Sequence, residues 1–161
     1  MITTYLVFVA VVVCVMWGFP VGVWASSRDS RTRVVAFLCD TFQTFPSFIY
    51  LIPVVMLFQV GTISQIMAIV IYAGIPMVRY TYLGLRNVPH EIVEAAITSG
   101  CTPRQILWKV RMPLALPEIT LGLNQTIMFS LFMVMIAGFI GGNYDLAREI
   151  FKAKANNDSG L

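Results

Sequence analysis

Charged side chains are scarce in this sequence, and they are unevenly placed. They make up 12% of the 161 residues, against 58% hydrophobic residues and a mean hydropathy of +0.78. A soluble domain usually carries about twice that charged fraction. Three stretches contain no charge at all: Met1–Ser27, Thr41–Val78 and Ile119–Tyr144. This pattern excludes an ordinary soluble domain and indicates a chain embedded in a lipid membrane.

Cysteine and histidine are also few. The three cysteines, Cys14, Cys39 and Cys101, are widely separated, and His90 is the single histidine. They form neither a disulfide framework nor a metal-binding pattern. The G-x-x-x-x-G-K-[ST] phosphate loop is missing as well. We therefore expect no cofactor and no enzymatic activity in this chain. Nucleic-acid binding is not expected either, because arginines at membrane edges account for the net charge of +3.

The charge-free stretches predict four membrane-spanning helices. A helix needs about 20 apolar residues to cross the bilayer core. The first and last stretches can each cross once, and the middle stretch is long enough for two crossings. We therefore expect an all-α, polytopic membrane protein: one transmembrane helical bundle over residues 1–161, with spans at 2–24, 34–60, 66–85 and 118–142.

The expected orientation follows from the lysines and arginines near the span ends. Cytoplasmic loops carry an excess of these residues. Eight of the 11 lie in the 26–33 and 79–111 intervals, which four spans place on one side, and the other three lie in the C-terminal tail. We therefore expect the 87–117 interval in the cytoplasm and both termini outside. In the tail, residues 145–155 are expected to form a short helix.

The 87–117 interval predicts two short helices joined at a glycine. The first, His90–Ser99, should end at Gly100, which can adopt a positive φ. The Ala95-Ala96 pair gives that helix a small, flat surface that another protein can approach closely. Taken by itself, however, an amphipathic helix lying on the membrane surface is the simpler interpretation.

A second helix is expected immediately afterwards. Thr102 is suited to the N-cap and Pro103 to the first helical position. The helix should cover Arg104–Val110, and Pro113 and Pro117 are expected to stop it.

The spacing in this interval resembles a known motif. Glu94-Ala95-Ala96 is followed after three residues by Gly100 and, after nine more, by Val110-Arg111-Met112-Pro113. This resembles the EAA loop of binding-protein-dependent ABC transporter permeases, whose usual pattern ends in I-x-L-P. Val110 and Met112 are mild apolar departures from that pattern. The resemblance implies a coupling helix that docks on an ATP-binding subunit through Glu94, Ala95, Ala96, Gly100 and Pro113.

Further segments resemble the glycine betaine, proline and choline branch of these permeases. They are residues 40–53, 75–79, 85–89 and 122–126. The resemblance implies a permease subunit, in the cell membrane, of an ATP-driven importer of a small osmolyte such as a quaternary amine. It also implies three partners: a cytoplasmic ATP-binding subunit, an extracytoplasmic substrate-binding protein and a second permease copy. Members of the family have further spans, so we expect this chain to be a partial one.

Two other functions stay open at this stage. The chain could be a permease for another small solute, such as an amino acid or a related amine. It could also be a small carrier or channel subunit that works without an ATPase. Recruitment of an ATP-binding subunit would separate the second alternative from the first.

Polar residues inside the expected spans are candidates for a substrate pathway. Gln43, Thr44 and Ser47 lie in the second span, and Asn124, Gln125 and Thr126 lie in the fourth. Such residues serve equally well as hydrogen-bonding contacts between helices, each worth about 0.6 kcal/mol, and the sequence does not decide between the two roles.

Tyrosines and one pair of opposite charges leave similar alternatives. Tyr50, Tyr72, Tyr80 and Tyr82 could pass a quaternary ammonium by cation–π contact, or anchor the helices at the membrane interface. Asp40 and Arg79 could pair with each other, or each could reach toward water.

Overall fold

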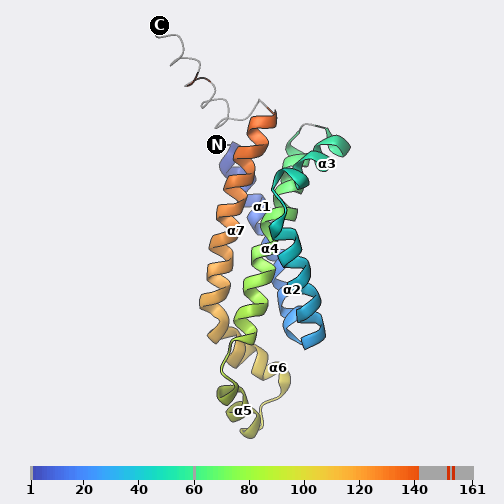
Figure 1. Ribbon diagram of the computed structural model, residues 1–161. Helices are drawn as coiled ribbons and strands as arrows, with labels where there is room; N and C mark the ends of the chain where they lie inside the picture. The colour runs from blue at the N-terminus through green and yellow to red at the C-terminus, as the bar shows by residue number, and fades with distance from the viewer. Residues whose placement is uncertain (1, 60, 142–151, 153, 155–161) are drawn as a thin grey trace.

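The fold is a bundle of long helices with a helical loop at one end. α1 (Ile2–Ser26) runs toward the loop end, α2 (Asp29–Thr44) runs back, α4 (Thr62–Arg86) runs toward it again, and α7 (Met112–Gly141) returns (Figure 1). The computed structural model describes residues 2–59, 61–141, 152 and 154. The helix expected over 145–155 lies outside the described residues, apart from Lys152 and Lys154.

Within the described residues, three helices are long and apolar enough to cross a membrane: Thr4–Ser26, Thr62–Arg86 and Pro103–Ala137. A fourth candidate is α2 together with α3 (Phe48–Phe58), which is bent by 85° at the break between them. The order of the elements along the bundle agrees with four crossings. The number of crossings remains a prediction, since three helices pass alone and the fourth passes only as a bent pair.

The break between α2 and α3 has a local cause. Phe45 precedes Pro46, and the residue before a proline is disfavoured in the α region. Phe45 is accordingly extended, with φ −76° and ψ 137°. The backbone carbonyl of Ser47 then accepts hydrogen bonds from the N–H groups of Tyr50 and Leu51, at 3.2 and 3.3 Å, and α3 begins.

The expectation that Pro113 and Pro117 end a helix is wrong. α6 (Pro103–Gln105), the π-helix η1 (Ile106–Arg111) and α7 form one continuous helix that includes both prolines. In η1 the Met112 N–H donates to the Leu107 carbonyl, five residues back. This wider turn makes room for the ring of Pro113, which in a regular helix meets the carbonyl four residues earlier.

Glycines allow α4 to pack closely between α1 and α7. A Cβ added at Gly22 of α1 would lie 2.5 Å from the Thr81 Cβ, and one added at Gly122 of α7 would lie 2.6 Å from the Tyr80 Cβ. In lipid, helices associate chiefly through van der Waals packing, and small residues permit it. α4 is therefore the central helix, and its neighbours approach it at glycines.

The outer surface of the bundle is apolar. Large hydrophobic side chains project from several helices and are mostly exposed, including Met16, Phe37 and Phe132. An exposed apolar surface of this extent indicates contact with lipid or another protein rather than water. It fits a multi-pass membrane protein.

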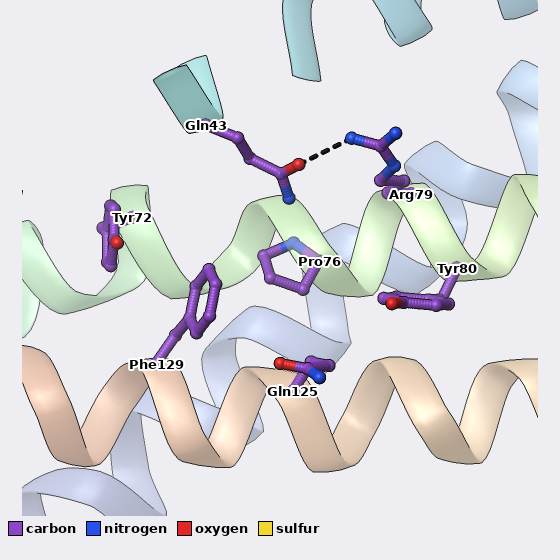
Figure 2. A pocket seen from close by; sticks show the side chains of 7 residues that line it. All are labelled: Gln43, Tyr72, Pro76, Arg79, Tyr80, Gln125 and Phe129. Atoms are coloured by element: carbon purple, nitrogen blue, oxygen red, sulfur yellow. Dashed lines mark hydrogen bonds between the residues drawn. The ribbon is translucent and has the colours of Figure 1, made fainter. Parts of the chain in front are cut away.

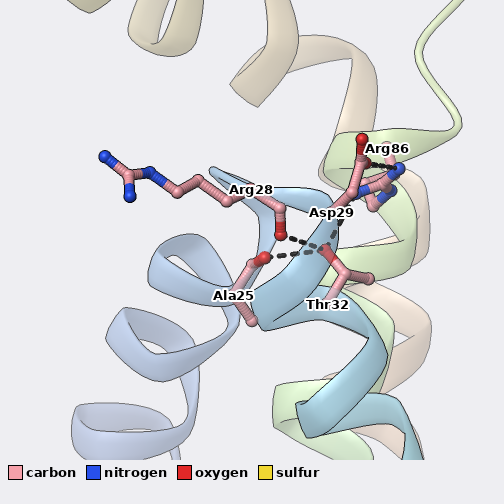
Figure 3. Close-up of polar contacts among 5 residues, drawn as sticks. All are labelled: Ala25, Arg28, Asp29, Thr32 and Arg86. Atoms are coloured by element: carbon pink, nitrogen blue, oxygen red, sulfur yellow. Dashed lines mark hydrogen bonds and ion pairs between the residues drawn. The ribbon is translucent and has the colours of Figure 1, made fainter.

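A polar cluster joins the loop end of α4 to the turn between α1 and α2 (Figure 3). Arg86 contacts Asp29 through Nη2 and Oδ1 at 2.5 Å, and its Nη1 donates to Thr32 Oγ1 at 2.9 Å. The Thr32 hydroxyl in turn donates to the Ala25 carbonyl at 2.8 Å. An exposed ion pair of this kind contributes at most about 1 kcal/mol. The cluster nevertheless ties three helix ends together beside the loop.

Candidate docking loop and transmembrane pocket

The loop between α4 and α7 begins with α5 (His90–Thr98), which ends as the sequence predicts. Gly100 has φ +78°, a left-handed conformation that favours glycine. The Cys101 N–H donates to the Ala96 carbonyl at 3.1 Å, and the Gly100 N–H donates to the Ile97 carbonyl at 2.9 Å. These two bonds form a Schellman motif, which satisfies the last carbonyls of α5.

The next helix begins two residues later, at the predicted cap. Thr102 Oγ1 accepts from the Gln105 N–H at 3.4 Å, and Gln105 Oε1 accepts from the Thr102 N–H at 2.8 Å. This reciprocal capping box satisfies two N–H groups that would otherwise lack partners. With both helix ends satisfied, the turn between α5 and α6 is defined by its own hydrogen bonds.

α5 has one side turned inward and another turned outward. Val93 is buried and, with Ile97, Ile106 and Leu107, lines an apolar hollow of about 450 Å³ between α5 and η1. Among the predicted docking residues, Glu94, Ala95 and Gly100 are exposed and Ala96 is half-buried.

Pro113, the fifth predicted docking residue, belongs to a different element. It is exposed, in the first turn of α7. The outward side of α5 therefore combines one carboxylate with the small side chains of two alanines, and it lies at the far end of the molecule from the N-terminus (Figure 1).

A second feature is a pocket of about 430 Å³ between α2, α4 and α7 (Figure 2). It is lined by Gln43, Tyr72, Pro76, Arg79, Tyr80, Gln125 and Phe129. Of the six predicted pathway residues, the structure brings two to this pocket, Gln43 from α2 and Gln125 from α7.

The other four predicted pathway residues lie elsewhere. Two of them use their hydroxyls locally: Thr44 donates to the Thr41 carbonyl at 2.7 Å, and buried Thr126 donates to the Gly122 carbonyl at 2.9 Å. Ser47 is buried at the break between α2 and α3. Asn124 lines a separate apolar hollow beside Pro117. These four residues therefore do not line this pocket, and their part in a pathway or in contacts between helices stays a prediction.

Asp40 and Arg79 pair, which settles the choice that the sequence left open. Arg79 Nη1 lies 2.7 Å from Asp40 Oδ1 and donates to Gln43 Oε1 at 2.6 Å. Arg79 is therefore held by two α2 side chains at the edge of the pocket, and Figure 2 shows its contact with Gln43.

Aromatic rings form much of the remaining wall. Of the four tyrosines considered from the sequence, Tyr72 and Tyr80 line the pocket, whereas Tyr50 contacts Tyr72 from outside it, with ring centroids 5.6 Å apart. Phe129 is a lining residue that sequence reasoning missed. A usable signal was present, because Gly122, Gln125 and Phe129 follow helical i, i+3, i+7 spacing and share one face of α7.

Comparison with known proteins matches the chain to one family, and the two relatives named below are permease proteins of transport systems. The model of the binding-protein-dependent transport system inner membrane component family matches residues 18–161. The chain is 50% identical over 159 residues to the trimethylamine N-oxide transport system permease protein TmoV of Ruegeria pomeroyi, a match that covers 99% of this chain and 24% of that protein. It is 42% identical over 163 residues to the glycine betaine/proline betaine transport system permease protein ProW of Salmonella typhimurium, covering 100% of this chain and 45% of that protein. The chain thus spans about a quarter of the first relative and under half of the second.

A solved structure shares the fold. A chain of the MetNI methionine ABC transporter, in inward facing conformations, superposes with a TM-score of 0.74 at 24% identity. The match covers 86% of this chain and 71% of that chain. The helical fold in Figure 1 is therefore similar, over most of this chain, to the fold of that solved chain.

Proposed function

Because this chain belongs to the family of binding-protein-dependent transport system inner membrane components, we propose that it acts as the permease subunit of an ATP-driven importer. Its all-α bundle and apolar surface suit a membrane-embedded role. Since the sequence has no phosphate loop, the energy comes from a separate ATP-binding subunit in the cytoplasm.

The observation that carries this proposal is the outward side of α5. Glu94 and Ala95 are exposed on α5. The C-terminal end of α5 is capped by the Schellman motif, and the next helix, α6, begins with a capping box. A docking helix has to present a surface that a partner can approach closely, and it has to keep its conformation while the partner moves it. The alanines meet the first requirement, and the hydrogen-bonded turn at Gly100 meets the second. Movement of the docked ATP-binding subunits would then rotate the spans between two states.

The proposed substrate is a small osmolyte of the quaternary-amine type. The relatives named above transport glycine betaine, proline betaine and trimethylamine N-oxide according to their names. All three compounds combine a positively charged, fully substituted nitrogen with a negatively charged oxygen. An extracytoplasmic substrate-binding protein and a second permease copy complete the proposed assembly.

Substituting Ala95→Arg is expected to reduce recruitment of the ATP-binding subunit at least about tenfold, equivalent to about 1.4 kcal/mol. A long, charged side chain at an exposed alanine prevents close approach of the partner. The measurement is co-purification of the ATP-binding subunit with the tagged permease from membranes.

The matched control for this test is Ser30→Arg, at another exposed position near the loop end of the bundle. It adds the same charge outside α5, so recruitment should match that of the parent. Equal recruitment by Ala95→Arg and the parent would exclude α5 as the docking helix. No recruitment by the parent itself would instead favour a carrier that works without an ATPase.

Uptake assays test the substrate class. The full transporter, reconstituted in liposomes with its ATP-binding subunit and binding protein, is expected to import glycine betaine, proline betaine or trimethylamine N-oxide when ATP is supplied. If it imports none of these but accepts an amino acid, the osmolyte assignment fails and the permease assignment stands.

A further inference from the structure

The pocket between α2, α4 and α7 has two chemically different ends. Tyr72 and Phe129 stand at one end, and Arg79 stands at the other together with the ring of Tyr80, with Pro76 between the two ends (Figure 2). Tyr72, Pro76 and Arg79 recur at i, i+4, i+7 spacing, so one face of α4 supplies both ends.

The aromatic end consists of packed rings. Tyr72 and Phe129 are stacked, with their centroids 5.3 Å apart and their planes at 17°. Tyr50 contacts Tyr72, and its hydroxyl donates to the Phe42 carbonyl, which holds the outermost ring in place. The face of an aromatic ring attracts a cation within about 6 Å of its centroid. A group of rings held in this way is suited to a methylated ammonium, which is large and weakly hydrated.

The polar end is a guanidinium that is not fully used. Both recorded contacts of Arg79, with Asp40 and with Gln43, are made by Nη1. Within the described part of the chain, Nη2 and Nε of Arg79 have no hydrogen-bond or ion-pair partner. Arginine presents five N–H donors in a planar fork that fits a carboxylate. The Asp40 pair can therefore persist while the rest of the guanidinium binds an anion.

We propose that this pocket is a substrate-recognition site for a single small zwitterion, with Arg79 binding its anionic oxygens and Tyr72 and Phe129 binding its ammonium group. Gln43 and Gln125 supply further polar contacts to the anionic group. The inference rests on the proposed importer function and extends it, because it makes the permease itself discriminate between substrates after the binding protein has released them.

The dimensions agree with a ligand whose two charges are a few ångströms apart. The seven-residue separation of Tyr72 and Arg79 corresponds to about 10 Å along the axis of α4. A ring-to-cation approach of about 4.5 Å, inside the limit of about 6 Å, and an N–H···O⁻ bond of about 2.8 Å leave about 3 Å of that length between the two charges. The pocket volume of about 430 Å³ also accommodates a small solute.

A purely structural Asp40–Arg79 pair is the competing explanation, and the molecule contains a comparison for it. Arg86, on the same helix, pairs with Asp29 at 2.5 Å, and its side chain is 37% exposed against 35% for Arg79. Arg86 does not line the zwitterion pocket. The two arginines therefore form ion pairs of similar exposure but line different pockets, since Arg86 lines one of about 260 Å³ beside the turn between α1 and α2.

Three ligands of similar size test the proposal. Glycine betaine carries both charges, choline carries only the ammonium, and 3,3-dimethylbutanoate carries the carboxylate with an uncharged tert-butyl group. Their binding is measured by competition with radiolabelled glycine betaine on the permease–ATPase complex in lipid nanodiscs, without the binding protein. The parent should bind glycine betaine at least about tenfold more tightly than either single-charge ligand.

Substitutions at the two ends of the pocket should each remove the preference for glycine betaine over a different single-charge ligand. Arg79→Gln is expected to lower the affinity for glycine betaine until this ligand binds no more tightly than choline. Phe129→Leu and Tyr72→Leu are expected to lower the affinity for glycine betaine by about three- to tenfold, so that it approaches the affinity for 3,3-dimethylbutanoate. Arg86→Gln and Tyr5→Leu, the latter at an exposed ring on α1, should keep the ranking of the parent.

The outcomes separate this site from the proposed function. If the parent does not distinguish the three ligands, or if Arg79→Gln keeps the parent ranking, the pocket is not the recognition site. If Arg86→Gln loses as much affinity for glycine betaine as Arg79→Gln does, the pocket is again not the recognition site, and the Asp40–Arg79 ion pair has only a structural role. Each of these results leaves the importer assignment intact as long as the parent transports glycine betaine. An absence of transport for every osmolyte would instead overturn the proposed osmolyte substrate, whatever the binding results.

Discussion

Replacing Gly22 with leucine is expected to remove most of the folded protein from the membrane. The first side-chain atom alone would lie 2.5 Å from the Thr81 Cβ and 2.9 Å from the Val78 carbonyl oxygen, both on α4. The carbonyl belongs to the backbone of the central helix and cannot rotate away. Overpacking of this kind costs about 1–3 kcal/mol for smaller insertions, and a leucine adds three more carbon atoms. Since total stabilities are about 5–15 kcal/mol, we expect a large fall in the unfolding temperature.

Gly61→Leu is the matched control for this prediction. Gly61 precedes α4, its φ of −169° is ordinary extended backbone, and a Cβ there has no atom within 4 Å. The same substitution should therefore change stability by only about 1 kcal/mol, the usual cost of a less favourable N-cap residue, because Gly61 is the N-cap of α4. Thermal unfolding in detergent, followed by size-exclusion chromatography, measures both variants. Similar unfolding temperatures for the two would show that α1 and α4 do not pack at Gly22.

The sequence predicts the long helices well because their signal is local. The predicted spans 2–24 and 66–85 lie within a few residues of the limits of α1 and α4, since each helix must be apolar over the width of the bilayer. The turn at Gly100 was equally predictable, because the helix end and the following Thr102 cap depend only on nearby residues. The close packing of α1 also had a sequence signal, the G-x-x-x-G spacing of Gly18 and Gly22.

Other features depend on residues that are distant in sequence. The rule for the residue before a proline predicts an interruption at Phe45, but the 85° angle between α2 and α3 depends on how both helices pack on α4. The helix continues through Pro113 because a π-helix precedes it, which the spacing of prolines does not reveal. The pocket unites Gln43, Arg79 and Gln125 from three helices, and only the bundle determines that these side chains converge.

The contact between α4 and α7 beside the loop has a functional consequence. Gly84 of α4 lies against α7, and a Cβ there would be 2.7 Å from the Glu118 Cβ and 3.2 Å from the Ala115 carbonyl oxygen. The loop that carries α5 starts at the end of α4 and leads into α7, so this contact joins the two helices into which a docked ATP-binding subunit would transmit force.

We expect Gly84→Leu to reduce ATP-driven uptake at least about tenfold, equivalent to about 1.4 kcal/mol in the transport barrier. The leucine separates α4 from α7, whereas Glu94 and Ala95 stay exposed on α5. Recruitment of the ATP-binding subunit should therefore be close to that of the parent, the reverse of the pattern expected for Ala95→Arg. Co-purification and uptake are measured on the same preparations, with Gly61→Leu as the control for added bulk.

The two readouts together test whether docking and transmission are separate steps in this chain. Normal uptake by Gly84→Leu would mean that the α4–α7 contact carries no force. Loss of both recruitment and uptake would mean that α5 depends on this contact for its own position. If uptake is lost while recruitment is retained, the blocked step is transmission of movement after docking. That step then depends on Gly84, where α4 and α7 meet.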